Sequence, residues 1–307
     1  MLTGTVIQTT GASYQVQVKD IIYVCTLKGK MRLSDIKTTN PISIGDIVDF
    51  EILKNNTGII VNIQNRKTSI VRKSTNLSKA AQTMAVNVDQ ILFVFTLINP
   101  ETPLIFLDRL LTIAEYNNLP VIIVVNKTDL YDEKDIDKLA EILAIYNNIG
   151  YKIILTSILK NKNIEEIKVI LKDRNTFVAG LSGVGKSSLI NSLIPDLNLK
   201  TADISKVHLA GRHTTTFAKM IQLPFSGYII DSPGNRAFGL INLKKENISH
   251  YFKEFFELLP NCKYYNCKHI NEPDCAIKKA VEIGKIAESR YKSYLNIMFD
   301  ENDKHRR

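Results

Sequence analysis

The sequence predicts a multi-domain protein with three parts: an OB-like (oligonucleotide-binding) β-barrel, a central α/β domain and a mostly helical, zinc-binding domain. Three observations predict these parts. Short β-type segments fill the first 65 residues, strands and helices alternate after Asp89, and three of the four cysteines lie between residues 262 and 275. A length of 307 residues suits two or three domains, which usually have about 100–200 residues each.

The barrel is expected over residues 1–65. Segments rich in Val, Ile, Tyr and Thr predict five strands, at 5–8, 13–18, 21–27, 47–53 and 58–63, with turn residues between them. Five strands in this length fit the OB barrel. An SH3-like barrel would give a similar pattern, so the exact barrel type stays open. Cys25, alone in an apolar run, is expected to be a buried thiol.

A polar linker is expected at residues 66–80, where the strand pattern lapses and several basic residues suggest phosphate contacts. The α/β domain follows at residues 81–240. Apolar strands are predicted at 91–97, 121–125, 153–156 and 177–179, and helices at 103–116, 133–146 and 163–171. This alternation predicts a mostly parallel sheet with helices on both faces.

A phosphate-binding loop is predicted at residues 180–187, which match G-x-x-x-x-G-K-[ST] at every fixed position. An apolar strand precedes the loop and an amphipathic helix follows it, a context that disfavours a chance match. Backbone N–H groups and the helix N-terminus can surround a phosphate, Lys186 should reach the β- and γ-phosphates, and Ser187 should bind Mg²⁺. The predicted phosphate-binding residues are Gly180, Leu181, Ser182, Gly183, Val184, Gly185, Lys186, Ser187 and Ser188.

Two further segments have the residue types of nucleotide switches. Asp231 ends an apolar strand, where a carboxylate can support magnesium, and Gly234 can offer its N–H to a γ-phosphate. Between this strand and the phosphate-binding loop, residues 211–216 contain three threonines, any of which could close on Mg²⁺. Thr214 and Thr215 are the first choices.

The base-reading motif is Asn126-Lys127-Thr128-Asp129, at the end of an apolar strand. In Ras-like GTPases the aspartate of N-K-x-D accepts hydrogen bonds from guanine, and adenine cannot offer this match. Asn126, Lys127 and Asp129 are therefore predicted to select guanine, with Thr156 and Ser157 in the loop that supports the base. An unpaired carboxylate would make adenine binding costly.

The motif order is unusual, because the base motif at 126 precedes the phosphate-binding loop at 180. Ligands bind at the carboxyl ends of parallel strands, so a circular permutation of the connections leaves the site intact. The central domain is therefore predicted to be a circularly permuted P-loop GTPase domain. In this order the segment after Gly234 leads straight into the C-terminal domain, so switch motion could reach that tail directly.

A closed zinc site is predicted in the C-terminal domain, residues 241–307. Cys262, Cys267, His269 and Cys275 supply three thiolates and one imidazole, which fill a tetrahedral zinc site and leave no position open for water. The predicted role is structural, since a short segment gains folding energy from the metal. Helical spacing of apolar residues from Ala276 to Ala287 predicts helix beyond the cluster.

The net charge of +9 is concentrated in the two flanking regions. Residues 1–73 carry +5, residues 74–240 carry +1 and residues 241–307 carry +3. Basic flanks suit a polyanion such as RNA, although solubility alone is the simpler alternative. We find neither a secretory signal nor an apolar run of the roughly 20 residues that span a membrane, which predicts a cytoplasmic protein.

Together, the permuted motif order and the C-x4-C-x-H-x5-C segment resemble the RsgA family of bacterial small-ribosomal-subunit biogenesis GTPases, over essentially the whole chain. The resemblance implies an OB domain, a permuted GTPase domain that binds GTP or GDP with Mg²⁺, and one structural Zn²⁺. It also implies binding to the 30S subunit and its 16S rRNA, a role in late maturation of that subunit, and GTP hydrolysis stimulated by it. A monomer without membrane attachment is expected.

The motifs offer two candidates for the residue that orients the attacking water. Ras-like enzymes have a glutamine directly after D-x-x-G, where this chain has the shorter Asn235, and the RsgA family usually has a hydrophobic residue. His213 is a second candidate, but an RNA contact or an exposed loop histidine explains it equally well.

Three functional hypotheses follow from the motifs. The first is an enzyme that switches, in which GTP favours binding to the subunit and hydrolysis favours release. The second is an RNA-docked assembly factor for which turnover is incidental. The third, an ATP-driven P-loop enzyme, is disfavoured by the base motif at 126–129.

Overall fold

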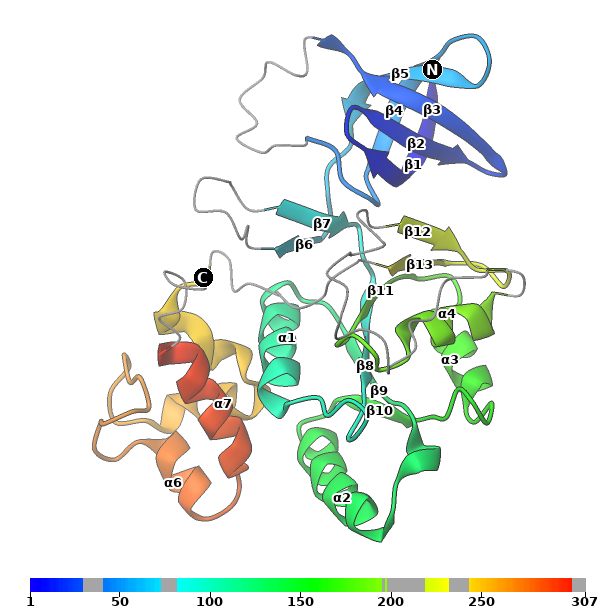
Figure 1. Ribbon diagram of the computed structural model, residues 1–307. Coiled ribbons are helices and arrows are strands. Elements are labelled where there is room, and N and C mark those ends of the chain that lie inside the picture. Colours follow the sequence, from blue (N-terminus) through cyan, green and yellow to red (C-terminus); the bar gives the residue numbers. More distant parts are fainter. Residues whose placement is uncertain (30–40, 73–81, 195–196, 198–218, 232–242, 300–307) are drawn as a thin grey trace, which may run out of the picture.

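The computed structural model describes residues 1–29, 41–72, 82–194, 197, 219–231 and 243–299. A barrel, a helix-covered sheet and a helical C-terminal domain follow one another along the chain (Figure 1). Among the helices in these ranges, none is long and apolar enough to cross a membrane.

The barrel consists of five strands that lie where the sequence predicts them. Strand β1 pairs with both β2 and β4, which closes the barrel, and β3 runs parallel to β5. The resulting order, β1-β2-β3-β5-β4, is a Greek-key order of the OB kind. Alternate residues of β3, namely Tyr23, Cys25 and Leu27, point into the core, so Cys25 is buried as expected. The strands are β1 (Leu2–Thr10), β2 (Ser13–Val18), β3 (Ile21–Leu27), β4 (Ile47–Ile52) and β5 (Thr57–Ile63).

A two-stranded hairpin occupies part of the segment predicted to be a linker. Strand β6 (Ser69–Arg72) pairs antiparallel with β7 (Gln82–Val86). The hairpin contacts the barrel through the backbone, since Val86 N–H donates to the carbonyl of Ile44 at 2.9 Å. At Gly45 (φ +89°) a Cβ atom would lie 2.1 Å from the Val86 oxygen, so a side chain there would separate the two parts.

The central domain has a sheet of five parallel strands in the order β10-β9-β8-β11-β13, with β12 antiparallel at the side of the barrel. The predicted strands and helices all lie within two residues of the observed ones. The strands are β8 (Gln90–Phe95), β9 (Val121–Val125), β10 (Lys152–Leu155), β11 (Asn175–Ala179), β12 (Lys219–Gln222) and β13 (Tyr228–Asp231). The helices are α1 (Leu104–Tyr116), η2 (Thr128–Leu130), α2 (Glu133–Asn148), α3 (Ile164–Leu171) and α4 (Lys186–Leu193).

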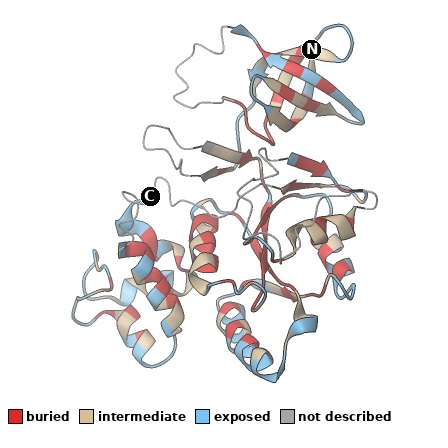
Figure 2. Cartoon of the chain, in the orientation of Figure 1, coloured by how far each residue is buried: buried red, intermediate tan, exposed pale blue. Residues whose placement is uncertain are grey.

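Both faces of this sheet are buried, which explains why its strands read as continuous apolar runs. On β8, Phe93 and Phe95 pack in the core formed with α1 and α2, whereas Leu92 and Val94 pack in the core formed with α3 and α4. Buried residues accordingly line the middle of the domain in Figure 2. The doubly covered parallel sheet predicted from the sequence is confirmed.

The C-terminal domain is assembled from short helices. Its core contains Phe252, Phe255 and Tyr294 together with Cys275, and Ile105 of α1 packs against it. The run from Ala276 to Ala287 is not one helix, because Gly284 adopts φ +72° after the first helix ends, and Ile283 is exposed rather than buried. The elements are η3 (Lys245–Tyr251), α5 (Lys253–Phe256), η4 (Leu259–Asn261), α6 (Ala276–Glu282) and α7 (Glu288–Phe299).

Candidate functional site

The predicted phosphate-binding loop connects the end of β11 to the start of α4. Ser182 and Gly183 are exposed at its crest, whereas Val184 is buried beneath it. Ser187 and Ser188 lie in the first turn of α4, so the helix N-terminus faces the loop. This arrangement directs backbone N–H groups toward an anion.

The glycines of the loop are required by its packing. Gly180 has φ +142°, and a Cβ atom there would lie 2.4 Å from the carbonyl oxygen of Val94 on β8. Gly185 has φ +102°, and a Cβ atom would lie 2.3 Å from Nδ2 of Asn126. These glycines therefore serve two purposes, a left-handed backbone and close approach to neighbouring strands.

Lys186 is held over the loop by its own backbone. The ammonium group donates to the carbonyl of Gly180 at 2.9 Å and to that of Leu181 at 2.6 Å. Burial lowers the pKa of Lys186, and the Asp231 carboxylate opposes this effect. Asp231 is the register partner of Val178 on the adjacent strand, and its charge acts on Lys186 of the phosphate-binding loop. Its role in supporting magnesium remains a prediction.

Asn126 connects three segments that are distant in sequence. Its backbone N–H donates to Phe95, its amide Nδ2 donates to the carbonyl of Val184 at 2.8 Å, and its Oδ1 accepts from Ile158 N–H at 3.3 Å. The side chain is 2% exposed. The base motif, the phosphate-binding loop and the 156–158 loop thus form one unit despite the permuted order.

The other base-motif residues face the same unit. Lys127, in the left-handed conformation (φ 63°), donates to the carbonyl of Gly183 at 2.8 Å, which places its stem alongside the phosphate-binding loop. Asp129 Oδ1 accepts a hydrogen bond from the Ser157 hydroxyl at 2.5 Å, which orients the carboxylate. Thr156 is fully buried, and its hydroxyl donates to Lys162. The structure brings Thr156 and Ser157 to the base motif, as expected.

Several predicted site residues lie outside the described ranges. They are the switch threonines Thr214 and Thr215, the γ-phosphate glycine Gly234, and the two catalytic candidates His213 and Asn235. Their predicted roles remain predictions.

Two residues at the base site were not found from the sequence. Asn99, in the loop after β8, offers its carbonyl to the Lys127 ammonium. Tyr131 accepts from Leu97 N–H at 3.0 Å and donates to the Asn126 carbonyl at 2.9 Å, so it ties the β8 loop to the base motif. The rule that parallel strands carry functional loops at their carboxyl ends points to the β8 loop, but a single tyrosine after N-K-x-D carries no such signal.

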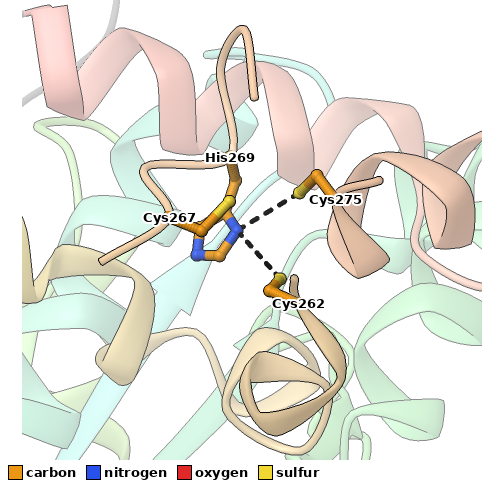
Figure 3. Close-up of side chains that lie close together, drawn as sticks. All are labelled: Cys262, Cys267, His269 and Cys275. Carbon is orange, nitrogen blue, oxygen red and sulfur yellow. Dashed lines mark hydrogen bonds between the residues drawn. The ribbon is translucent and has the colours of Figure 1, made fainter. Parts of the chain in front are cut away.

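The four predicted metal ligands come together in the C-terminal domain, with their ligand atoms all within 4.8 Å of one another. Nδ1 of His269 lies 3.3 Å from the sulfur of Cys275 and 3.6 Å from that of Cys262 (Figure 3). Tetrahedral zinc with usual bond lengths would separate sulfur and nitrogen ligands by about 3.5 Å. The geometry therefore fits one zinc ion.

The chemistry of the donor set also fits a divalent metal. Burial raises the pKa of the Cys267 thiol to about 12 and also raises that of Cys275. Such thiols do not ionise at neutral pH unless a cation stabilises the thiolates, and zinc supplies that charge. With four protein ligands the site would be closed, which supports a structural role.

Helix α7 supports the segment that carries these ligands, residues 262–275, here called the metal loop. The Tyr291 hydroxyl donates to the His269 carbonyl at 2.6 Å, and the Tyr294 hydroxyl donates to the Lys268 carbonyl at 2.7 Å. Glu272 accepts from the backbone N–H groups of Lys268 and Ile270, each at 2.9 Å. Backbone groups around the ligands are thereby satisfied within the domain.

Comparisons with known protein families and proteins identify relatives of this chain. Residues 63–241 match the family described as RsgA GTPase, and residues 3–60 match the RsgA N-terminal domain. A relative from Bacteroides fragilis, called small ribosomal subunit biogenesis GTPase RsgA, is 46% identical over 98% of both chains. One of the same name from Christiangramia forsetii is 43% identical over 99% of this chain and 98% of its own.

Two solved structures share the fold over nearly the whole chain. The crystal structure of YjeQ from Thermotoga maritima superposes with a TM-score of 0.80 at 35% identity and covers 99% of each chain. YloQ, described as a circularly permuted GTPase, superposes with a TM-score of 0.74 at 28% identity, covering 99% of this chain and 96% of its own. The permuted order inferred from the motifs is thus also found in a structural relative.

Proposed function

The chain belongs to the RsgA family of GTPases, and on that premise we propose that it assists late maturation of the small (30S) ribosomal subunit. In this proposal it binds GTP, hydrolyses it to GDP and phosphate, and is stimulated by the subunit. The GTP-bound form favours the subunit-bound state, and hydrolysis favours release.

One observation carries the nucleotide part of the proposal: Asn126 joins the base motif to the phosphate-binding loop by a hydrogen bond to Val184. A guanine ring held by Asp129 and phosphates held by residues 180–188 would then belong to one nucleotide. A P-loop without this hydrogen bond could bind the phosphates of many ligands. The hydrogen bond sets the distance between the base site and the phosphate site.

Each group at the site has a proposed role. Asp129 accepts from N1–H and the amino group of guanine, and Ser157 keeps the carboxylate in position. Lys186 leaves its loop carbonyls to contact the β- and γ-phosphates, Ser187 binds Mg²⁺, and Asp231 supports the metal from the neighbouring strand. Thr214 or Thr215 and Gly234 complete the γ-phosphate side, with Asn235 or His213 as candidates to orient water.

The flanking domains are proposed to contact RNA. Residues 1–73, which are the barrel and the first part of the linker, carry +5 of the net charge, and residues 241–307 carry +3; neutralisation of RNA phosphates by such groups releases counterions. We propose 16S rRNA as the partner, a monomeric cytoplasmic protein, and a structural Zn²⁺ on Cys262, Cys267, His269 and Cys275.

The ribosomal part is tested by measuring GTP hydrolysis with and without purified 30S subunits. Stimulation by 30S but not by 50S subunits is expected. An unchanged rate would remove the ribosomal assignment and leave the GTPase assignment intact. Release from 30S that is equal with GTP and with a non-hydrolysable analogue would favour the assembly factor over the switch.

The base site is tested by Asp129→Asn. Loss of a charged hydrogen-bonding partner, about 1.5–3 kcal/mol, should weaken GDP binding roughly 10- to 150-fold. The asparagine amide can instead donate to the 2-oxo group of xanthine, so binding of the xanthosine nucleotide should improve. Asp137→Asn on the exposed side of α2 is the matched control. Undiminished preference for guanine in Asp129→Asn would contradict the assigned role.

A further inference from the structure

A second ligand site is indicated beside the metal loop, away from the nucleotide site. A cavity of about 220 Å³ lies between η3 and the metal loop. On this scale one water needs about 10–15 Å³, so the cavity holds a much larger group. Its lining combines polar side chains from both segments with aromatic rings: Glu246, Ser249, His250, Tyr264, Asn266 and Lys268 are among them. Cys262, Cys267 and His269 also line it, so the predicted zinc position forms the inner end of this cavity.

Exposed aromatic side chains form one side of this cavity. Tyr265 is fully exposed and Tyr264 is 41% exposed, and both line the cavity. Neighbouring tyrosines in an exposed turn are unusual when they serve no packing role, since folding gains nothing from rings that stay in water. Exposed rings next to a cavity are suited to stack on a planar ligand.

Two lysines lie close to these rings, and the Glu246 carboxylate also lines the cavity. The Lys263 ammonium lies 5.8 Å from the centre of the Tyr264 ring. Lys268 lines the cavity, and its side chain forms no ion pair with any residue that the structure describes. The acidic residues of the metal loop are already engaged: Glu272 by backbone N–H groups, and Asp274 by Lys263 at 3.5 Å and Lys279 at 3.2 Å.

The cavity walls are held in place before any ligand binds. Tyr291 and Tyr294 of α7 fix the backbone at His269 and Lys268, and Ser249 is 3% exposed. His269 also lines the cavity, and its buried Nε2 has no hydrogen-bond partner among the described residues. Preformed walls reduce the entropy lost on binding.

We propose that this cavity binds an unpaired nucleotide of RNA, with the base stacked on Tyr264 and Tyr265 and its edge hydrogen-bonded by the polar lining. Lys268 and Lys263 contact the adjoining phosphates. Stacking on aromatic side chains together with a positively charged surface is how single strands are bound without a duplex. The inference rests on the proposed role on the ribosomal subunit and names the RNA feature that the metal loop recognises.

The test uses the full-length, zinc-loaded chain and a fluorescein-labelled single-stranded RNA of about 12 nucleotides, in the size range that single-strand binding modules cover. Tyr265→Ala should weaken RNA binding about 5- to 150-fold, which corresponds to 1–3 kcal/mol for one stacked base. Tyr265→Phe should retain the affinity, because the ring remains. Phe299→Ala, which removes an exposed ring at the end of α7, is the control.

A second readout reports stacking itself. A 2-aminopurine base in the RNA should be quenched by the wild-type chain and by Tyr265→Phe, but much less by the double variant Tyr264→Ala, Tyr265→Ala. Zinc content of each variant, measured by atomic absorption, should be unchanged because the rings are exposed.

Several results would overturn the inference. Equal RNA affinity in the wild type and Tyr265→Ala, or an equal loss in Phe299→Ala, would remove the cavity as the RNA site. Unchanged RNA affinity combined with weaker binding to intact 30S subunits would assign the tyrosines to a ribosomal protein instead. A wild-type chain that binds no RNA but is stimulated by 30S would defeat this inference and leave the proposed function standing.

Discussion

The two domains that flank the GTPase domain reach a stable fold by different means. The barrel encloses its own core of ten buried residues, with Val6, Tyr14 and Phe50 among them, and its strands close on one another. The C-terminal domain is built from short helices, and its hydrophobic cluster includes Cys262, Cys267 and Cys275 themselves. The hydrophobic core of the barrel therefore needs no cofactor. In the helical domain, metal ligands occupy positions in the core that apolar side chains would otherwise fill.

The two flanking domains also differ in the contacts that join them to the central domain. The barrel is attached through backbone hydrogen bonds to the β6–β7 hairpin and through β1, which pairs with β12 at Gln8 and Lys219. Asp46 and Arg66 form an ion pair nearby, with the arginine 31% exposed. The C-terminal domain is attached through Arg290 of α7, which is 1% exposed and contacts Asp108 of α1 at 2.5 Å and Glu254 at 2.6 Å. Both ion pairs bury an aspartate, but only the second also buries its arginine, so the loss of the second should cost more.

Tyr146 extends this buried junction into α2. Its hydroxyl donates to Asp108 Oδ1 at 2.7 Å, and the Arg290 guanidinium lies 4.5 Å from the centre of the Phe252 ring. Helix α1, which follows the loop that contacts Lys127, thus forms part of both the nucleotide domain and the C-terminal interface. We therefore expect the C-terminal domain and α1 to unfold together, and the barrel to unfold more independently of the other two domains.

Metal removal should produce the largest difference between the two flanking domains. Structural zinc contributes about 10–16 kcal/mol to the folding of small zinc domains. We expect Cys275→Ser to lose the bound zinc and the helical circular-dichroism signal of α6 and α7, while the barrel stays folded. Amide hydrogen exchange, followed segment by segment, measures this. Cys25→Ala, which removes a buried thiol from the barrel, should keep one zinc per chain; zinc loss in that control would contradict the assignment.

Removal of the buried arginine should have the next largest effect. In Arg290→Met, the buried Asp108 and the partly buried Glu254 lose their partner, which typically costs about 3–5 kcal/mol. The urea midpoint of unfolding should fall accordingly, and adding Asp108→Leu should restore part of the loss. The exposed Arg174→Met is the control. A midpoint equal to that of the control would show that this junction does not hold the two domains together.

The smallest effect is expected at the barrel junction. Arg66 donates to both carboxylate oxygens of Asp46, at 2.8 and 2.7 Å, but Asp46 also accepts from Ser43 N–H at 2.7 Å. Arg66→Ala should therefore cost only about 1.5–3 kcal/mol. Faster amide exchange is expected at residues 43–46 and not at α7. Lys67→Ala is the matched neighbour, and a loss in Arg66→Ala as large as in Arg290→Met would reverse the comparison.

Regular elements could be predicted from local patterns with few errors. Alternation in the barrel and continuous apolar runs in the central sheet identify strands such as 13–18 and 121–125 to the residue. The errors occur where tertiary contacts override local pattern. Residues 69–72 lie in the stretch predicted to be a polar linker, yet they pair with β7. The helical spacing beyond Ala276 does not show that the chain turns at Gly284.

The sequence by itself determined the chemistry of the sites, because phosphate, guanine and zinc each require particular residue types at short spacing. Tertiary structure alone decided how those sites are connected. The bond from Asn126 to Val184 joins residues 58 positions apart, and that from Arg290 to Asp108 joins residues 182 positions apart. No local pattern encodes such pairs, since they depend on which helices and strand ends the fold brings together.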